Sequence, residues 1–294
     1  MPSTFGHRQS RSGLAVILAV LALAALSFGL WRSFDGDRDH RQIAAERARR
    51  LAIAKRGDAL PGTPDLAALS SRLGANGLTL GAPVFIRIFK REFELEVWLK
   101  RDDRYHRFAV YPICRWSGEL GPKLIEGDAQ APEGFYTIDK RSLNPSSRWH
   151  KAFNLGFPNA FDRARGYTGS FLMVHGGCSS VGCYAMTNPV IDELWRLVEA
   201  ALRRGQPRVH VHVFPFRLSP DNLAARGTSP WSGFWRDLEP GYDAFEATHL
   251  PPRVSVCGGR YQVARMDDDR SPAGPIAIQC GDRPELIPAV AGKP

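Results

Sequence analysis

The feature that most constrains how this chain folds is an uncharged run near its amino terminus. Residues 12–31 contain no charged side chain, and a helix of about 20 apolar residues is long enough to cross a bilayer. His7, Arg8 and Arg11 precede the run, which predicts an amino end inside and the rest of the chain outside. We therefore expect residues 1–31 to act as a signal-anchor or a signal peptide.

Between these two fates we favour an uncleaved anchor, because the run is long for the apolar part of a signal peptide. The small residues at 24–27 offer an alternative cleavage site. A buried core helix is the third interpretation, and the basic residues directly before the run argue against it. An anchor with this orientation predicts contact with the membrane and a location of the following residues on its outer side.

Export changes how the five cysteines are interpreted. Paired thiols form disulfides in an oxidising compartment, and an odd number leaves at least one thiol free. We expect Cys257 and Cys280, which lie close together in the last segment, to be bridged. Cys114 and Cys178 can form a second pair and leave Cys183 free, although counting alone leaves Cys178 as another candidate for the free thiol.

The chain is basic, with a formal net charge of +9, and many of its cations lie between Arg32 and Arg56. Such an excess suits nucleic acid, anionic lipid or an anionic polymer. We predict no nucleic-acid partner, because no zinc-finger spacing or aromatic-rich RNA motif accompanies the charge. Residues 32–80 are expected to form a solvated basic linker with short helices, one of them beginning with Pro64 in its first turn and ending at Gly74.

After Pro83 the hydrophobic pattern has a period of two, which indicates strands. Residues 93–100 alternate between apolar and mostly polar side chains, so one face is expected to be buried and the other solvated, and a turn at 101–104 predicts a hairpin with residues 105–113. Other runs typical of strands are 134–138, 171–174 and 208–214. His210 and His212 alternate with valines and are expected on a solvated face. This region is mainly β.

One long helix is predicted from Asn188 to Gly205, with Pro189 in its first turn and apolar residues at helical spacing. Beyond Leu218 the chain is rich in Pro and Gly, and residues 219–294 are expected to form an irregular or small appended region.

The residues most typical of chemistry lie between the last predicted strand before this helix and the helix itself. His175 falls at the strand end and Cys183 in the loop that follows, so an imidazole and a thiol are close in sequence. A thiol reacts as its thiolate, and a nearby His supplies a proton acceptor. The segment therefore predicts a cysteine nucleophile.

The amino-acid sequence of this segment, His-Gly followed by Ser-x-Gly-Cys-Tyr-Ala-Met, resembles the signature of L,D-transpeptidase catalytic domains. The His-Gly and the Cys are separated by 183 − 175 = 8 positions, which is similar to a compressed branch of the family that includes enzymes acting on the diaminopimelate linkage between a lipoprotein and peptidoglycan. Val181 and Ala185 stand where the commoner branch has His and Arg. Three further segments, 121–128, 131–136 and 155–162, also look like that family.

The resemblance implies an L,D-transpeptidase-like β-sandwich with one or more helices over residues 81–217, followed by an extension at 218–294. Cys183 would attack the carbonyl at the L-centre of diaminopimelate in a peptidoglycan stem peptide, and His175 would carry the proton. The carbonyl of Gly176 would orient the imidazole, and amides around Gly182 and Cys183 would hold the oxyanion. No cofactor is implied.

Several points remain open at this stage. Candidate substrate-binding residues are Lys123, Glu126, His150, Ser180 and Tyr184. Lys123 and Glu126 can instead form ion pairs that hold a turn, and Ser180 can bind the loop backbone. The intermediate can pass to an amine or to water, so the alternative to transfer is an amidase that releases a wall-linked lipoprotein; another alternative is a non-catalytic wall-binding module.

A zinc site is a competing interpretation of the same residues. His175, Cys178 and Cys183 with His210 or His212 include enough ligands, but their spacing does not match paired Cys-x-x-Cys sites, and a metal would quench the nucleophile. We expect no metal.

Overall fold

The computed structural model describes residues 38–264 and 274–280. Two compact units are present, Met1–Gln42 and Ile43–Pro294, and everything below concerns the second. In the described ranges no helix is both long enough and apolar enough to span a membrane. The predicted membrane segment at 12–31 lies outside these ranges.

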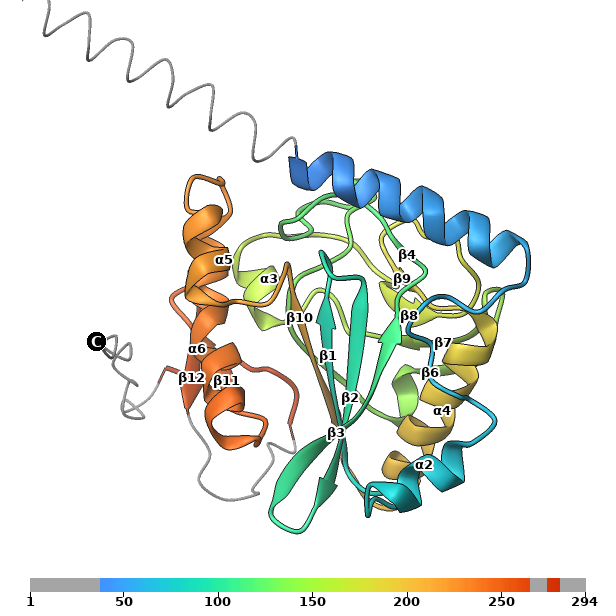
Figure 1. Ribbon diagram of the computed structural model, residues 1–294. Coiled ribbons are helices and arrows are strands. Elements are labelled where there is room, and N and C mark those ends of the chain that lie inside the picture. Colours follow the sequence, from blue (N-terminus) through green and yellow to red (C-terminus); the bar gives the residue numbers. More distant parts are fainter. Residues whose placement is uncertain (1–37, 265–273, 281–294) are drawn as a thin grey trace, which may run out of the picture. The chain divides into compact units, whose positions relative to one another are not determined.

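Two five-stranded sheets form the centre of the second unit (Figure 1). The first sheet has the order β3-β2-β1-β10-β5, and the second has the order β4-β9-β8-β7-β6. A separate hairpin pairs β11 with β12. The strand bounds are β1 Val84–Phe89, β2 Glu94–Arg101, β3 Arg104–Pro112, β4 Arg115–Trp116, β5 Gly134–Ile138, β6 Leu143–Ser147, β7 His150–Asn154, β8 Met173–His175, β9 Tyr184–Ala185, β10 Val209–Phe214, β11 Arg253–Cys257 and β12 Arg260–Ala264.

Five helices and a 3-10 turn accompany these strands in the described chain, in addition to a helix over residues 38–55. They are α2 Leu69–Ala75, η1 Lys140–Ser142, α3 Ala160–Ala164, α4 Asn188–Arg203, α5 Pro220–Ala225 and α6 Ser232–Thr248. The prediction of a helix with Pro64 in its first turn was wrong, because α2 begins only at Leu69. The Asp65 carboxylate instead accepts the amide N–H of Ala67 in a local turn.

The main core lies between the two sheets and α4. It combines apolar side chains of β1, β2 and β10 with Phe153, Val174 and Tyr184 of the second sheet and the buried face of α4. This supports the predicted mainly β fold with helices. The predicted hairpin is also present, since β2 and β3 pair in antiparallel register.

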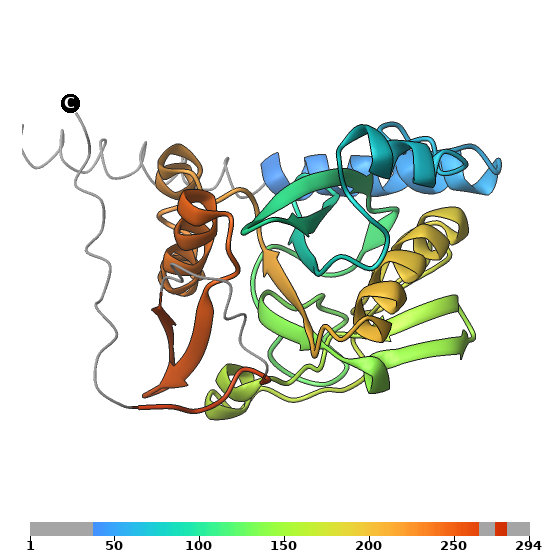
Figure 2. The ribbon, with the colours of Figure 1, turned by 90° about the horizontal axis from the view of Figure 1, so that it is seen from below.

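The outer face of the first sheet is buried as well, which the alternating pattern did not predict. α6 and the β11–β12 hairpin, orange to red, lie on that side of the sheet, opposite α4 (Figures 1 and 2). The helix approaches so closely that a Cβ on Gly241 would lie 2.4 Å from the ring of Phe135. Residues 219–264 are therefore helices and a hairpin rather than the irregular region expected.

Burial of this outer face corrects the expectation for the polar positions of two strands. His212 is fully buried, with its ring edge-on to Phe85 and Phe135 at 4.7 Å each, and His210 is 2% exposed. Burial holds the pKa of His212 well below its usual value. In β2, Glu96 is 1% exposed and forms ion pairs with the guanidinium of Arg217 instead of facing solvent.

Two disulfide bonds are present, the expected Cys257–Cys280 and also Cys114–Cys178, and Cys183 is free. The Cys257–Cys280 disulfide joins the end of β11 to residues 274–280. In this segment Ile278 forms an isolated parallel β-bridge with Val256. The prediction that Cys257 pairs with Cys280 is confirmed, and the pairing of Cys114 with Cys178 answers the question left open by counting.

The helix over 38–55 is not a purely solvated linker from Ile43 onward. Ile43 is 2% exposed, and the Arg50 guanidinium donates to the carbonyl of Ile113 at 3.0 Å. The Arg47 guanidinium stacks over the ring of Trp116 at 4.2 Å and donates to the carbonyl of Gly118. Cations of this helix therefore bind the segment that carries Cys114.

A buried ion pair joins the first sheet to the segment that precedes β5. Lys90 and Glu133 are both 0% exposed, with Nζ 2.9 Å from the carboxylate. Glu133 also accepts the amide of Gly121 and the indole N–H of Trp235 in α6. This network fixes the backbone at Gly121 against α6.

Candidate active site

The segment from His175 to Cys183 connects two parallel neighbours of the second sheet. β8 ends at His175 and β9 begins at Tyr184, and the two strands pair in parallel register. The amide of Met186 donates to the carbonyl of His175 at 2.7 Å, so the loop leaves and re-enters the sheet at nearly the same level. His175, at the end of β8, and Cys183, directly before β9 and beside Met173, thus lie on adjacent strands.

His175 has a single defined tautomer in this arrangement. Its side chain is 1% exposed, and Nδ1–H donates to the carbonyl oxygen of Gly176 at 2.6 Å. Because a carbonyl only accepts, Nδ1 carries the proton and Nε2 is left as the basic atom. A Cβ on Gly176 would lie 2.8 Å from the carbonyl oxygen of Trp149, so glycine is required for this close approach.

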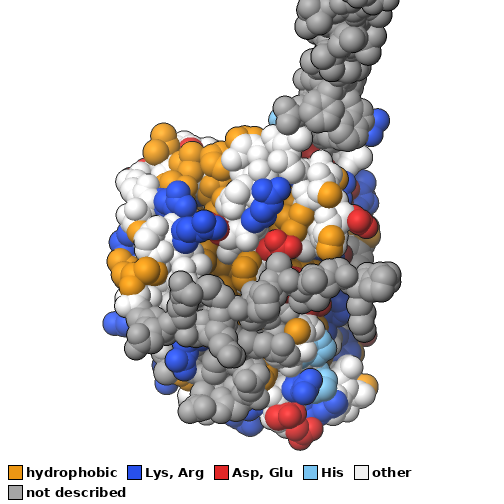
Figure 3. Space-filling view, turned by 90° about the vertical axis from the view of Figure 1, so that its left-hand side faces the viewer, with side chains coloured by type: hydrophobic (Ala, Val, Ile, Leu, Met, Phe, Trp, Pro, Cys, Tyr) orange, Lys and Arg blue, Asp and Glu red, His pale blue; other side chains and the backbone are white. Residues whose placement is uncertain are grey.

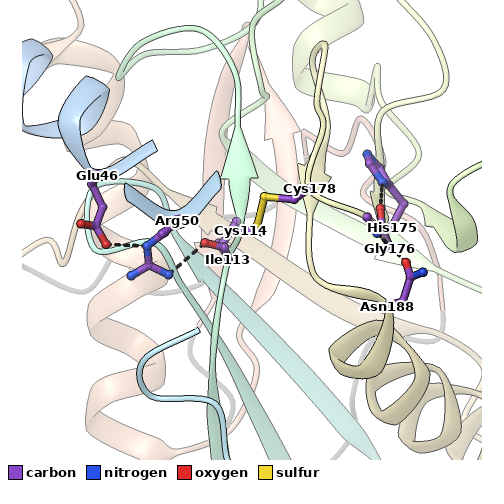
Figure 4. Close-up of a disulfide and its surroundings, with 9 residues drawn as sticks. Glu46, Arg50, Ile113, Cys114, His175, Gly176, Cys178 and Asn188 are labelled. Atoms are coloured by element: carbon purple, nitrogen blue, oxygen red, sulfur yellow. Dashed lines mark hydrogen bonds and ion pairs between the residues drawn. A yellow bond between two sulfur atoms is a disulfide. The ribbon is translucent and has the colours of Figure 1, made fainter. Parts of the chain in front are cut away.

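Two neighbours restrict the imidazole further. The Trp149 ring stacks on it, with centroids 5.7 Å apart and an interplanar angle of 29°. The amide of Gly177 donates to the side-chain oxygen of Asn188 at 2.7 Å, which ties the loop to the first turn of α4 (Figure 4). The N-cap of this helix is Thr187.

The Cys183 thiol points toward β8 and the residues before it. Its Sγ accepts the amide N–H of Met173 at 3.4 Å and lies 3.7 Å from the carbonyl oxygen of Phe171. Among the described residues no hydrogen bond joins the thiol directly to the imidazole. Both side chains nevertheless line one cavity of about 360 Å³.

This cavity, which we call the thiol cavity, is open to solvent and has a mixed lining. Phe171 and Val181 are 72% and 78% exposed and supply its apolar rim. The remaining lining residues are Asn144, Ser147, Arg148, Trp149, Met173, His175, Ser179 and Cys183.

Burial sets the protonation of the two reactive groups. It lowers the pKa of His175 and raises the pKa of the Cys183 thiol. The amide of Met173 and the positive charges of Arg148 and Lys123 partly offset the rise for Cys183. Near neutral pH the site therefore holds a thiol and a neutral imidazole, rather than a preformed thiolate–imidazolium pair.

Two serine hydroxyls hold the loop around the thiol. Ser180 Oγ accepts the amide of Cys183 at 3.0 Å and donates to the carbonyl of the same residue at 2.6 Å. Ser117 Oγ accepts the amide of Gly182 and lies 3.3 Å from Ser180 Oγ. The amides of Gly182 and Cys183, expected to face an oxyanion, are thus already occupied. The amide of Val181, on the cavity rim, has no acceptor in the described part of the chain.

A disulfide bond fixes the middle of the same loop. Cys178 is bonded to Cys114, which directly precedes β4, and Figure 4 shows the bridge between these two segments. The amide of Cys114 donates to the carbonyl of Ala185 in β9 at 2.8 Å. The segment that carries Cys114 and Ser117 therefore supports the loop from both its middle and its end.

The predicted substrate-binding residues lie in different surroundings. Lys123 is 4% exposed and forms an ion pair with Asp128 that closes a turn, as in the alternative interpretation, although its charge reaches Cys183. Glu126 is exposed on that turn and does not line the thiol cavity. His150 donates to Asp192 at 2.9 Å beside Trp149.

Tyr184 is the most deeply buried member of this set. It is fully buried, and its hydroxyl donates to the carbonyl of Pro132 at 2.6 Å. A side chain with no exposed surface cannot contact a substrate, so Tyr184 supports the loop from beneath. The expectation that it binds substrate is corrected on this ground.

Sequence reasoning missed Ser117, Arg148 and Trp149. Ser117 lies 66 positions before Cys183 along the chain (183 − 117 = 66). Trp149 lies 34 positions before Cys183 (183 − 149 = 34) and 26 before His175 (175 − 149 = 26). Only Arg148 and Trp149 had a signal, because they directly precede His150, one of the predicted substrate-binding residues. Arg148 brings a cation to a site whose signature has Ala185 in place of Arg.

The zinc interpretation loses its ligand set in this structure. The disulfide removes the Cys178 thiol, and His212 is enclosed by aromatic rings on the outer face of the first sheet. Within residues 38–264 and 274–280 no group of three or more His, Cys, Asp or Glu side chains is placed to hold a metal ion.

Comparison with known proteins finds a family model and two relatives that match the chain. The family model of the L,D-transpeptidase catalytic domain (YkuD) matches residues 85–213. The chain is 50% identical over 186 residues to "Putative L,D-transpeptidase YafK" of Escherichia coli strain K12, which covers 63% of this chain and 76% of that protein. The same identity and coverage hold for the protein of that name in Escherichia coli O157:H7.

Two solved structures resemble the chain more distantly. The helical cell shape determining protein Pgp2 from Campylobacter jejuni is 21% identical, with a TM-score of 0.37, over 60% of this chain and 65% of that one. Bd1075 from Bdellovibrio bacteriovorus is 20% identical, with a TM-score of 0.34, over 55% and 60%. On the sequence matches, the chain belongs to the L,D-transpeptidase catalytic domain family.

Proposed function

We propose that this protein is a cysteine-dependent acyltransferase that acts on peptidoglycan stem peptides, with Cys183 as nucleophile and His175 as proton carrier. The observation that carries the proposal is the free thiol of Cys183 in one cavity with a buried imidazole whose Nε2 is unprotonated. The other four cysteines are bonded in pairs, so no second thiol of the chain competes for this role.

The chemistry follows from the tautomer. His175 Nε2 takes the thiol proton as Cys183 Sγ attacks the carbonyl at the L-centre of diaminopimelate, and a C–S bond forms. The same proton then passes to the departing amine as the C–N bond breaks. The thioester is resolved when an acceptor amine or water attacks its carbonyl, which frees the thiol again. The Gly176 carbonyl keeps Nδ1 protonated throughout, so Nε2 remains the basic atom.

Charge around the cavity suits an anionic peptide. Arg148 is exposed on the rim and lowers the pKa of both reactive groups, so it also attracts a substrate carboxylate. Lys123 adds positive potential at the Cys183 thiol. We assign the unbonded amide of Val181 as the hydrogen-bond donor to the developing oxyanion. The Cys183 amide becomes a second donor when the Ser180 hydroxyl rotates away from it.

Two disulfide bonds support an oxidising location. Together with the basic and uncharged segments at the amino terminus, they favour the periplasmic side of a bacterial envelope, with an anchor at residues 12–31. We propose the domain arrangement expected above, an L,D-transpeptidase domain over 81–217 with flanking extensions.

A second function, hydrolysis of the same linkage to release wall-attached lipoprotein, is favoured by the short spacing between His175 and Cys183. The thiol cavity is open beside exposed Phe171 and Val181, which leaves room for water as the acceptor. Product analysis in ¹⁸O-labelled water separates the two outcomes, since only hydrolysis places the label in the new carboxylate.

The proposal is tested by intact-mass measurement after exposure to a carbapenem and by turnover of a diaminopimelate-containing muropeptide. We expect one adduct on the wild type, none on Cys183→Ala, and turnover at least about 10²-fold lower in His175→Gln. An adduct on Cys183→Ala contradicts the assignment of Cys183 as nucleophile. Wild-type protein that neither forms an adduct nor turns over the muropeptide contradicts the proposed activity and favours a wall-binding module.

A further inference from the structure

A second cavity, of about 370 Å³, lies outside the catalytic machinery, between α3, the beginning of α6 and β12. We call it the aromatic cavity. Tyr167, Trp231 and Phe234 are half-buried around it, and Phe161 forms its floor. Its other lining residues are Arg165, Pro230, Gly233, Asp237 and Arg260. Figure 3 looks onto the side of α5 and α6, where hydrophobic side chains gather beside Lys and Arg side chains.

The lining combines exposed ring faces with polar groups. The Trp231 indole N–H and the Tyr167 hydroxyl have no hydrogen-bond partner among the described residues, and the Arg260 side chain is 67% exposed beside Asp237. Aromatic faces pack against the apolar C–H faces of sugar rings, while free N–H and O–H groups bind their hydroxyl and amide substituents. The volume lies in the range of small-ligand sites, which are mostly apolar with a few placed polar groups.

The aromatic cavity is joined to the thiol cavity by one short segment. Tyr167 lines the first and Phe171 lines the second, and four residues span at most roughly 14 Å. The segment is held beside the Lys123 turn, because the amide of Thr168 donates to the carbonyl of Leu124 at 2.9 Å.

Trp231 also touches the beginning of that turn. A Cβ on Gly121 would lie 2.5 Å from its Nε1, so the indole packs directly on the backbone before Pro122. The buried pair of Lys90 and Glu133 fixes the same glycine. The two cavities are therefore held at a set separation by rigid contacts.

We propose that the aromatic cavity binds one or two sugar rings of the glycan strand that carries the stem peptide. This inference rests on the proposed function. Diaminopimelate is the third residue of a stem peptide, so its L-centre lies roughly 10 Å from the sugar when the peptide is extended. That length is within the roughly 14 Å that the segment between the cavities can span at most, and the peptide then passes the turn that carries Lys123 on its way to Cys183.

Binding is tested on the full chain carrying Cys183→Ala, with β-1,4-linked N-acetylglucosamine tetramer as the probe, by calorimetry and tryptophan fluorescence. We expect saturable binding that weakens about tenfold in Trp231→Leu and in Phe234→Leu, because each loses a stacking ring. Trp195→Leu on α4 is the matched control, and thermal melts verify the fold of each variant. No binding at millimolar tetramer, or equal weakening in the control, overturns the proposal.

Kinetics give the second readout. For wild type and Trp231→Leu, kcat and KM are compared on a disaccharide-linked stem peptide and on the same peptide without sugar. We expect Trp231→Leu to raise KM about tenfold for the sugar-linked substrate alone. An equal effect on both substrates overturns the glycan site. If the wild type turns over neither, the proposed function fails, while the tetramer measurement still decides whether the cavity binds sugar.

Discussion

Breaking the Cys114–Cys178 disulfide should impair both stability and catalysis, whereas breaking the Cys257–Cys280 disulfide should impair stability alone. The first bridge holds the loop that ends at Cys183. The second closes the end of the β11–β12 hairpin region and does not touch a residue that lines the thiol cavity. The two double variants, with each Cys replaced by Ser, are therefore a matched pair.

The stability effect follows from the lengths of the closed loops. The bridged residues are 64 and 23 positions apart, for which the chain-entropy relation gives roughly 4 and 3 kcal/mol. In a domain of this size 1 kcal/mol shifts the midpoint by a few degrees, so each variant should melt roughly 10 °C lower. The two losses should differ by only about 1 kcal/mol.

The catalytic effect should differ much more. Without its bridge, Cys178 no longer fixes the loop between His175 and Cys183, and a displacement of about 1 Å at a reacting atom can lower the rate about 10²-fold. We expect the acylation rate of Cys183 by a carbapenem, measured by stopped flow below both melting midpoints, to fall at least about tenfold in Cys114→Ser/Cys178→Ser. The control pair should acylate at the wild-type rate.

Two results would refute this reasoning. If both double variants acylate as fast as the wild type, the bridge has no part in positioning the thiol. If Cys257→Ser/Cys280→Ser slows acylation as much as the other pair, the loss reflects general destabilisation rather than loop geometry.

Three further perturbations probe the charges. Arg148→Gln should move the alkylation profile of Cys183 by iodoacetamide to higher pH, since the lost cation lowers the pKa of the thiol; an unchanged profile would show that its charge does not reach Sγ. Burial raises the pKa of Asp162 to about 7 from 3.8, so its contribution to stability is present below pH 4 and is lost as pH rises through 7. The melting temperature of Asp162→Asn should accordingly change less between pH 4 and 8 than that of the wild type. Lys90→Met leaves Glu133 buried without its cation and should cost about 3–5 kcal/mol in urea unfolding, and adding Glu133→Gln should recover part of that loss.

Local patterns in the sequence predicted the elements whose conformation depends mainly on near neighbours. The helix after Asn188, the β2–β3 hairpin and β10 follow from apolar spacing over a few residues. The strand, loop and helix around His175 and Cys183 follow likewise, and the short spacing between these two residues already placed them at one site.

Tertiary structure decided which polar strand faces are buried and which residues from distant segments surround the candidate site. A strand with a period of two has one apolar face, but whether the other face meets water depends on α6, which covers His212 from residues far along the chain. The same holds for Ser117, Arg148 and Trp149, which no spacing rule connects to Cys183. Hydrophobic periodicity is a property of neighbouring residues, whereas burial of a polar face and assembly of a site come from contacts between remote segments. The sequence by itself therefore determined the candidate nucleophile, its candidate base and the strand and helix on either side of them, and only folding decided which side chains surround them.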